Sequence, residues 1–154
     1  MLKYAEIALS YREVPNEISL CIYLSGCKQN CENCHYLELK QIDYGEWLHL
    51  HYTDIIDLYL TQATCVCFLG EGQGSKAEIE ELSQYAVYAN KLGLKTGLYC
   101  GRDAIIEPWM ERFDYLKLGS YQPNFGPLDA PSTNQRMYRK SENGYIDITS
   151  MFWE

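Results

Sequence analysis

The segment that decides the fold runs from residue 64 to residue 78 and reads Thr-Cys-Val-Cys-Phe-Leu-Gly-Glu-Gly-Gln-Gly-Ser-Lys-Ala-Glu. The run from Thr64 to Leu69 is short, apolar and rich in strand-forming residues, which predicts a buried parallel strand. The glycines between residues 70 and 74 allow the backbone to approach a ligand closely. Ser75 and Glu78 have the spacing of a capping box, which predicts a helix from about Lys76 to Leu92. Strand, glycine turn and capped helix together make one βα unit.

Similar units occur on both sides of this segment. Further strands are predicted at Ser19 to Leu24, Leu94 to Tyr99 and Tyr115 to Leu118, and further helices from about Asp43 to Leu60 and from Asp103 to Phe113. Alternating strands and helices favour a parallel sheet with right-handed crossovers. A closed eight-fold barrel takes about 250 residues, whereas this chain has 154. We therefore predict a single domain over residues 1–154, with an α/β fold that forms a partial, open (β/α) barrel.

Both ends of the chain depart from the βα pattern. Residues 1–18 alternate weakly and contain the pair Pro15-Asn16, which indicates an arm or hairpin. Residues 122–135 contain three prolines and predict a long irregular excursion, a kind of loop that is usually functional or mobile. The pair Asn143-Gly144 lies between two strand-like runs and predicts a C-terminal β-hairpin.

Composition excludes several classes of function. Hydrophobic residues make up 47% of the chain, and 13 basic residues against 21 acidic ones give a net charge of -8. A nucleic-acid partner requires a basic face, and no cluster of Lys or Arg occurs in the sequence. No apolar run approaches the length of a membrane span, and Met1 to Arg12 lacks the apolar run of a signal peptide. We expect a soluble cytoplasmic protein with neither nucleic-acid nor membrane partners.

The most distinctive chemistry lies in a loop after the first predicted buried strand. Residues 24–37 read Leu-Ser-Gly-Cys-Lys-Gln-Asn-Cys-Glu-Asn-Cys-His-Tyr-Leu, which spaces Cys27, Cys31 and Cys34 as Cys-x3-Cys-x2-Cys. Thiolates hold iron-sulfur clusters, and a cluster of four irons normally takes four of them. Three ligands would leave one iron with an open coordination site, where a substrate can bind.

Three other readings of this loop remain. Cys27, Cys31, Cys34 and His35 match a Cys3His zinc site, although the adjacent Cys34 and His35 must point apart. Residues 31–35 also match the c-type haem signature Cys-x-x-Cys-His, but that chemistry requires export. Disulfides are disfavoured because the expected compartment is reducing. The other cysteines, Cys21, Cys65, Cys67 and Cys100, are interpreted as packing residues.

With an apolar strand before it, this cysteine loop resembles the signature of the radical S-adenosylmethionine enzymes. The resemblance implies that Cys27, Cys31 and Cys34 bind a four-iron, four-sulfur cluster, and that S-adenosylmethionine binds its open iron. The residue before the third cysteine is often aromatic in the family, whereas here it is Asn33. By position, Asn33 and His35 correspond to the part of the family's loop that passes the adenine.

The glycine turn after the strand at Thr64 to Leu69 extends this resemblance. Gly70 and Glu71 match the family's Gly-Gly-Glu-Pro element, which holds the amine of S-adenosylmethionine, while Leu69 and Gly72 depart from it. The alternative interpretation is an ordinary βα turn with a solvated glutamate. The turn at Gly70, the turn at Cys100-Gly101, the turn at Gly119 and the cysteine loop are all expected at the carboxyl edge of the sheet, where ligands bind in such folds.

The C-terminal third resembles one branch of this superfamily. Thr133-Asn134-Gln135-Arg136, after the strand end at Gly119, looks like the Asn-Gln-Arg tail of the anaerobic ribonucleotide reductase activating proteins. In place of their Asp-Gly pair after the fourth strand, this chain has Leu118-Gly119. The resemblance implies that the reduced cluster cleaves S-adenosylmethionine to a 5'-deoxyadenosyl radical, which takes a hydrogen atom from a glycine of the reductase.

The partners implied by this resemblance are the anaerobic ribonucleotide reductase and an external one-electron donor such as flavodoxin. Two other classes of function remain open. One is another small radical S-adenosylmethionine enzyme, either a formate-lyase-type activase or an enzyme that acts on a small heterocycle. The other is a non-enzymatic Cys3His zinc module.

Overall fold

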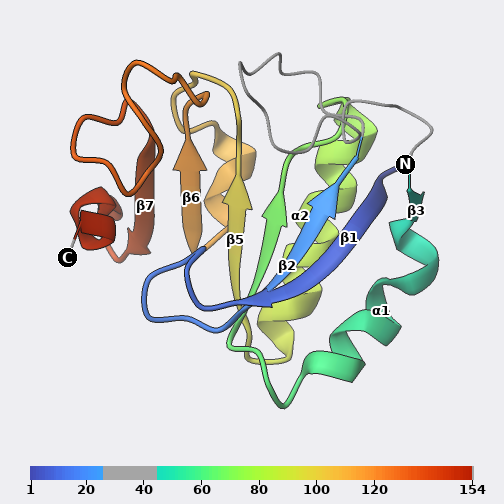
Figure 1. Ribbon diagram of the computed structural model, residues 1–154. Coiled ribbons are helices and arrows are strands. Elements are labelled where there is room, and N and C mark those ends of the chain that lie inside the picture. Colours follow the sequence, from blue (N-terminus) through green and yellow to red (C-terminus); the bar gives the residue numbers. More distant parts are fainter. Residues whose placement is uncertain (26–44, 154) are drawn as a thin grey trace.

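The computed structural model of the protein describes residues 1–25 and 45–153 (Figure 1). Its strands are β1 (Lys3–Ser10), β2 (Ser19–Leu24), β3 (Glu46–Trp47), β4 (Cys65–Leu69), β5 (Lys95–Tyr99), β6 (Tyr115–Leu118), β7 (Arg136–Ser141) and β8 (Gly144–Asp147). Its α-helices are α1 (Leu48–Tyr59) and α2 (Lys76–Lys91), and its 3-10 helices are η2 (Pro108–Arg112) and η3 (Thr149–Trp153). Within the described ranges, the strands form one sheet in the order β3-β1-β2-β4-β5-β6-β7-β8.

The centre of the sheet consists of the four predicted buried strands. β2, β4, β5 and β6 pair in parallel, with Cys21 beside Cys67 and Cys67 beside Gly97 in the register. Antiparallel strands extend this centre on both sides, β1 and β3 beside β2, and β7 and β8 beside β6. The sheet therefore ends at β3 on one side and β8 on the other, which confirms an open α/β fold rather than a closed barrel.

Helix α2 follows its predicted bounds closely because its ends carry strong local signals. The Ser75 hydroxyl accepts a hydrogen bond from the Glu78 backbone N–H at 3.2 Å, and the Glu78 carboxylate accepts the Ser75 N–H at 3.4 Å. This reciprocal pair satisfies two of the backbone donors that the first turn leaves without helical partners. Beyond the C-terminal end of the helix, Gly93 has a φ of 86°, a conformation that disfavours other residues.

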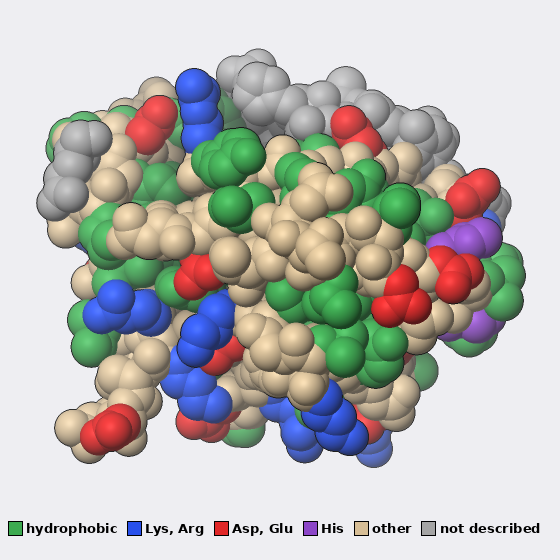
Figure 2. All heavy atoms as spheres, turned by 90° about the horizontal axis from the view of Figure 1, so that it is seen from below, with side chains coloured by type: hydrophobic (Ala, Val, Ile, Leu, Met, Phe, Trp, Pro, Cys, Tyr) green, Lys and Arg blue, Asp and Glu red, His purple; other side chains and the backbone are tan. Residues whose placement is uncertain are grey.

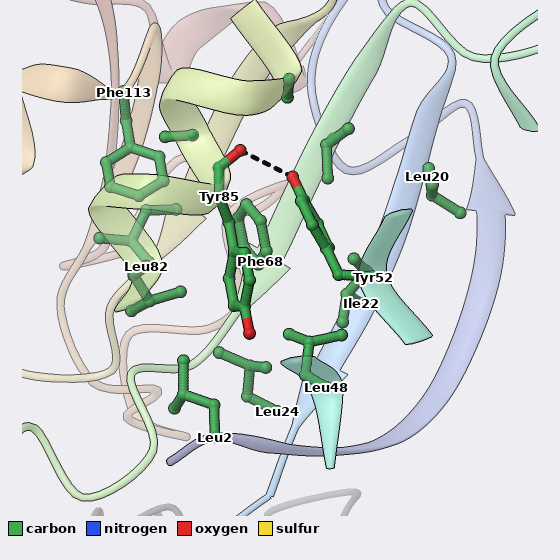
Figure 3. Close-up of a cluster of buried hydrophobic side chains, with 14 of the residues drawn as sticks. Leu2, Leu20, Ile22, Leu24, Leu48, Tyr52, Phe68, Leu82, Tyr85 and Phe113 are labelled. Atoms are coloured by element: carbon green, nitrogen blue, oxygen red, sulfur yellow. Dashed lines mark hydrogen bonds between the residues drawn. The ribbon is translucent and has the colours of Figure 1, made fainter. Parts of the chain in front are cut away.

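The larger hydrophobic core lies between the sheet and the helices α1 and α2. Figure 3 shows its aromatic centre, where Phe68 of β4 packs among Tyr52 of α1, Tyr85 of α2 and Phe113, with ring centroids 6.1 to 6.2 Å from that of Phe68. The Tyr52 hydroxyl donates a 2.7 Å hydrogen bond to the Tyr85 carbonyl, so its buried oxygen is satisfied. Burying large aromatic surfaces supplies much of the stabilisation of such a core.

The opposite face of the sheet carries a second, smaller core. Cys21, Cys65 and Cys67 are buried there as free thiols, and Val14 from the loop after β1 packs among them. Met151 and Phe152 of η3 pack against the same cluster, so the loop after β1 and the C-terminal helix both lie on this face (Figure 1). The packing role predicted for these cysteines is confirmed.

Several predicted elements differ in the structure. The helix predicted from Asp103 to Phe113 is wrong, because only η2 (Pro108–Arg112) is helical there. Asp103 accepts hydrogen bonds from the Ser120 N–H and hydroxyl, and Pro108 has no N–H to continue a helix from the preceding turn. Of the arm or hairpin predicted for residues 1–18, the structure has the hairpin, because β1 and the loop after it lead into an antiparallel pairing with β2.

The first helix also begins later than predicted. α1 starts at Leu48, directly after β3, whereas the predicted start at Asp43 lies outside the described residues. The irregular excursion at residues 122–135 and the C-terminal hairpin of β7 and β8 are confirmed. Neither α1 nor α2 has the length and apolar character required to cross a bilayer, and the described ranges contain no other helix that has them.

Candidate functional site at the carboxyl edge of the sheet

The carboxyl ends of the parallel strands meet at one edge, as predicted. The Gly70 N–H donates to the Tyr99 carbonyl at 2.9 Å, and the Cys100 N–H donates to the Lys117 carbonyl at 2.8 Å. The Gly119 N–H in turn donates to the Arg102 carbonyl at 2.9 Å. These hydrogen bonds join the turns after β4, β5 and β6 into one continuous edge.

The predicted cluster ligands Cys27, Cys31 and Cys34, together with Asn33 and His35, lie outside the described residues. The two ends of this segment are described, and they meet at the carboxyl end of β2. The Ser25 N–H donates to the Lys3 carbonyl at 2.9 Å, and a Cβ on Gly45 would lie 3.2 Å from the Ser25 hydroxyl oxygen.

The backbone at position 45, at the far end of this segment, requires a glycine. It has a φ of 97°, and an added Cβ would lie 2.3 Å from the Tyr4 carbonyl oxygen, far inside van der Waals contact. Ser25 and Gly45, the described residues on either side of residues 26–44, therefore lie close together beside the carboxyl edge of the sheet.

The predicted turn at Gly70 and Glu71 lies next to this place. Gly70 has a φ of 111°, and a Cβ added there would be 3.7 Å from the Leu24 side chain and carbonyl, which is ordinary contact. The backbone conformation, rather than crowding by described residues, therefore explains the glycine. The position adjoins the end of β2, because the neighbouring residues Leu69 and Tyr23 are register partners.

Glu71 is not the solvated glutamate of an ordinary turn. Its side chain is 9% exposed, and its two carboxylate oxygens accept hydrogen bonds from Arg102 Nε and Nη2, each at 2.8 Å. Arg102 also contacts the Glu107 carboxylate, with Nη1 to Oε2 at 3.1 Å. Bidentate pairs of this kind are strong and fix the direction of both side chains. The turn after β4 is thus tied to the turn after β5.

Charge in this network shifts the ionisation of its members. Hydrogen bonds from Arg102 and the Trp109 indole hold the pKa of Glu107 below its ordinary value. Burial, reinforced by the negative charge of Glu71, raises the pKa of the Cys100 thiol to about 11. Cys100 is therefore a protonated, weakly reactive thiol at neutral pH.

Arg102 is the site residue that sequence reasoning missed. It follows Gly101 after a predicted strand, so a cation at the same edge as Glu71 was visible in the sequence. Arg102 lies between the predicted turn at Cys100-Gly101 and the predicted helix from Asp103 to Phe113, and neither prediction gives its side chain a role. Its partner Glu71 is 31 positions away, and no local spacing rule connects the two.

The stretch Thr133-Asn134-Gln135-Arg136 fastens the excursion after β6 to the same edge. The Thr133 hydroxyl donates to the Gly126 carbonyl at 3.1 Å, and the Asn134 amide nitrogen donates to the Ser120 carbonyl at 3.0 Å. A Cβ on Gly119 would lie 3.2 Å from the Gln135 Cα, so the turn and this stretch are tightly packed. The stretch shapes the edge, and Asn134 itself is held by backbone contacts.

Among the described residues, no group of His, Cys, Asp and Glu side chains is arranged to hold a metal ion. Comparison of the chain with protein-family models, curated proteins and solved structures gives no match. What the described edge offers chemically is a glycine turn with a carboxylate held by a guanidinium, beside both ends of a cysteine-rich segment.

Proposed function

We propose that the protein is a radical S-adenosylmethionine activase that generates the glycyl radical of an anaerobic ribonucleotide reductase. One observation carries the proposal: the segment that contains Cys27, Cys31 and Cys34 is anchored at Ser25 and Gly45, beside the glycine turn at the carboxyl end of β4. Ligands of parallel α/β sheets bind at this edge. The segment thus begins and ends where a cluster would have to be held.

The shape of the sheet supports the same reading. β2, β4, β5 and β6 are parallel, α1 and α2 cover one face, and the sheet remains open at its edges (Figure 1). We interpret this arrangement as a partial (β/α) barrel of the radical S-adenosylmethionine type, in which the face opposite the helices is the inner face. An open side suits a substrate that is a loop of another protein.

The pairing of Glu71 with Arg102 supports the assignment of Glu71 to the amine of S-adenosylmethionine. Both Glu71 oxygens accept hydrogen bonds from Arg102, and because a carboxylate oxygen can accept more than one, this pair does not by itself prevent Glu71 from accepting a hydrogen bond from an ammonium group. Arg102 would then keep the carboxylate ionised and correctly directed. Gly70 has no side chain that would stand between the adjoining backbone and a ligand.

In this proposal Cys27, Cys31 and Cys34 would hold the cluster, Gly70 and Glu71 the amine, and Asn33 and His35 would flank the adenine. When bound, the cluster and S-adenosylmethionine would supply the electron transfer and the hydrogen-abstracting radical. The chain's own residues position the cofactor and exclude water. An external donor such as flavodoxin would reduce the cluster in the cytoplasm, where thiols such as the buried Cys21 stay reduced.

Charge on the surface supports a protein partner over nucleic acid. In the view of Figure 2, Lys and Arg side chains are interspersed with Asp and Glu on the face seen from below. The net charge of -8 would oppose approach to a phosphate backbone. The proposed partner is therefore the reductase, with neither nucleic acid nor membrane involved.

Anaerobic reconstitution with iron and sulfide tests the cluster. We expect a brown protein that loses its iron when Cys27, Cys31 or Cys34 is replaced by Ala, because a three-thiolate site has no spare ligand. Cys65→Ala is the matched control and should retain its iron, since that thiol packs in the second core. A colourless protein that binds zinc instead would reject the proposal.

The reaction is tested on the reconstituted protein. With dithionite and S-adenosylmethionine, we expect 5'-deoxyadenosine by chromatography, and with the cognate reductase we expect the glycyl doublet by electron paramagnetic resonance. Formation of 5'-deoxyadenosine with no radical on the reductase would move the assignment to another small radical S-adenosylmethionine enzyme. A doublet on a formate-lyase-type protein instead would identify that class of activase.

A further inference from the structure

Helix α1 carries exposed leucines on the side that points away from the core. Leu50 is 61% exposed and Leu58 is 69% exposed, whereas Ile55 and Ile56 on the other side are buried. The two leucines are two helical turns apart, so they lie along one side of the helix with about 12 Å between them. Single exposed apolar residues are common on protein surfaces. The charges around this pair therefore decide what the surface can bind.

Acidic side chains lie between and beside these leucines. Asp54 is four positions from each leucine, Asp57 directly precedes Leu58, and both carboxylates are exposed. Residues 41–75 contain no Lys or Arg, so α1 has no basic side chain of its own to balance these charges. In the described part of the chain, neither carboxylate takes part in an ion pair. Figure 2 shows apolar and acidic side chains together around the His side chains of α1.

Asp57 is unfavourable for the helix that contains it. The last turn of α1 has no basic residue, and the carbonyl groups at the C-terminal end of a helix carry a partial negative charge. The helix dipole therefore repels a carboxylate in this turn. Residues that break a local rule are expected at functional sites. A positive charge that binds here from outside the chain would offset the repulsion.

The N-terminal end of α1 is different in charge. Lys3 Nζ lies 4.5 Å from the centre of the Trp47 ring, where it would repel a basic partner. The nearby Glu46 carboxylate already accepts a hydrogen bond from the Tyr4 hydroxyl at 3.2 Å. A positively charged partner would therefore contact α1 from Leu50 onward.

The combination of apolar and acidic side chains argues against two occupants. An anionic membrane surface binds apolar helix faces that are flanked by Lys or Arg, and it would repel acidic ones. Two copies of the chain that met symmetrically through this surface would bring the same carboxylates against one another. Like charges brought together in an interface oppose association. The surface instead complements an apolar surface that carries positive charge.

We propose that the outward face of α1, defined by Leu50, Asp54, Asp57 and Leu58, binds an amphipathic helix of another protein that has Lys or Arg beside its apolar residues. The apolar side chains of the partner would pack on the two leucines, and its basic side chains would pair with the two carboxylates. The proposal is independent of the activase function, because this face uses none of the residues assigned to the cluster or to S-adenosylmethionine.

Fluorescence anisotropy tests the proposal with the full chain and a labelled synthetic helical peptide that has Leu on one face and Lys on both sides of it. Two matched peptides have Glu in place of every Lys, or Ser in place of every Leu. We expect the Leu/Lys peptide to bind at least about tenfold more tightly than either one, because each of the others lacks half of the complementary surface. Its advantage over the Leu/Glu peptide should shrink as salt is added.

Substitutions in α1 should affect the two kinds of contact separately. Leu58→Gln should weaken binding of the Leu/Lys peptide about tenfold, because an apolar contact is lost. Asp54→Asn/Asp57→Asn should weaken binding several-fold and remove most of its dependence on salt.

The control variants make the same changes elsewhere on the surface. Ile105→Gln changes an exposed apolar residue in the loop after β5, and Asp129→Asn/Glu142→Gln removes two exposed carboxylates outside α1. Each control should change the affinity for the peptide by less than about twofold, since only long-range, screened electrostatics differ.

A second measurement requires no peptide. Asp57→Asn removes the charge that the helix dipole repels, so it should raise the thermal midpoint of the chain by about 1 to 3 °C. Far-UV circular dichroism would follow the transition. A lower midpoint would contradict the conclusion that Asp57 is unfavourable in the chain alone.

The proposal is overturned if the Leu/Lys peptide does not bind saturably, if the Leu/Glu peptide binds as tightly, or if a control variant weakens binding as much as its counterpart in α1. Sedimentation of the chain alone tests the other occupant. A dimer that Leu58→Gln dissociates would assign this face to a second copy of the chain and would also overturn the proposal.

Discussion

Replacing Arg102 by Met would leave the Glu71 carboxylate without its partner at the edge of the sheet. Two hydrogen bonds of 2.8 Å are lost, and the remaining carboxylate is only 9% exposed. Hydrogen bonds to charged groups contribute about 1.5 to 3 kcal/mol each when buried, but the Arg102 side chain is 34% exposed, which lowers the total. We expect Arg102→Met to reduce the free energy of unfolding by about 2 kcal/mol.

The cause of that loss is tested by a second substitution. In Arg102→Met/Glu71→Gln the unpaired negative charge is gone, so the double variant should be about 1 kcal/mol more stable than Arg102→Met alone. Stability would be measured by urea unfolding, followed by tryptophan fluorescence, with the midpoint shifting at constant m value. Thermal midpoints should differ by about 2 to 4 °C between the two variants, as expected for a chain of this length.

The control pair is Arg136 and Asp147, whose Nε and Oδ2 lie 3.7 Å apart with both side chains more than 40% exposed. Arg136→Met should cost less than about 1 kcal/mol, as for other exposed ion pairs. The double variant could instead lose as much stability as Arg102→Met and Glu71→Gln lose together. In that case, removing the guanidinium does not leave an unfavourable unpaired carboxylate at Glu71. The account of this site as a coupled pair would then be wrong.

Three further outcomes follow from the described packing. Burial raises the pKa of Glu13 in the folded protein, so ionisation of this side chain opposes folding, and Glu13→Gln should be more stable than the parent at pH 7. In urea unfolding, the difference in stability between the two proteins should shrink as the pH falls toward the ordinary Glu pKa of 4.5. A difference that grows as the pH falls would contradict the raised pKa of Glu13. Cys100 has a pKa of about 11 and no exposed surface, so its thiol should resist iodoacetamide at pH 8 in the native protein and react in urea. Mass spectrometry would measure the extent of labelling. Rapid labelling of Cys100 in the native protein would contradict its burial. Phe68→Ala should lower the free energy of unfolding, measured with urea, by about 3 to 5 kcal/mol. Ile105→Ala, at a position that is 83% exposed, should change it by less than about 0.5 kcal/mol. Similar losses of stability in the two variants would contradict the core around Phe68.

Several features were predictable from the sequence because they depend on neighbouring residues. The apolar run before Gly70 and the capping box at Ser75 encode a strand and a helix within fifteen positions, and the structure reproduces both. The parallel order of the central strands followed from their alternation with helices and from the handedness of crossovers. The cysteine spacing is equally local, and the cluster it predicts remains a prediction because those residues lie outside the described ranges.

Other features depend on contacts that no local pattern encodes. Glu71 and Arg102 are 31 positions apart, and their pairing exists because adjacent parallel strands end at one edge. The loss of the predicted helix at Asp103 has the same origin, since a hydrogen bond from Ser120, 17 positions away, holds that residue. Lys117 lies in a strand that the local sequence predicts, but its burial to 9% exposure, with Nζ donating to the Gly119 carbonyl at 3.1 Å, is decided by tertiary packing. Local rules set the elements of this protein, whereas distant partners that meet at the strand ends decide which side chains share a site.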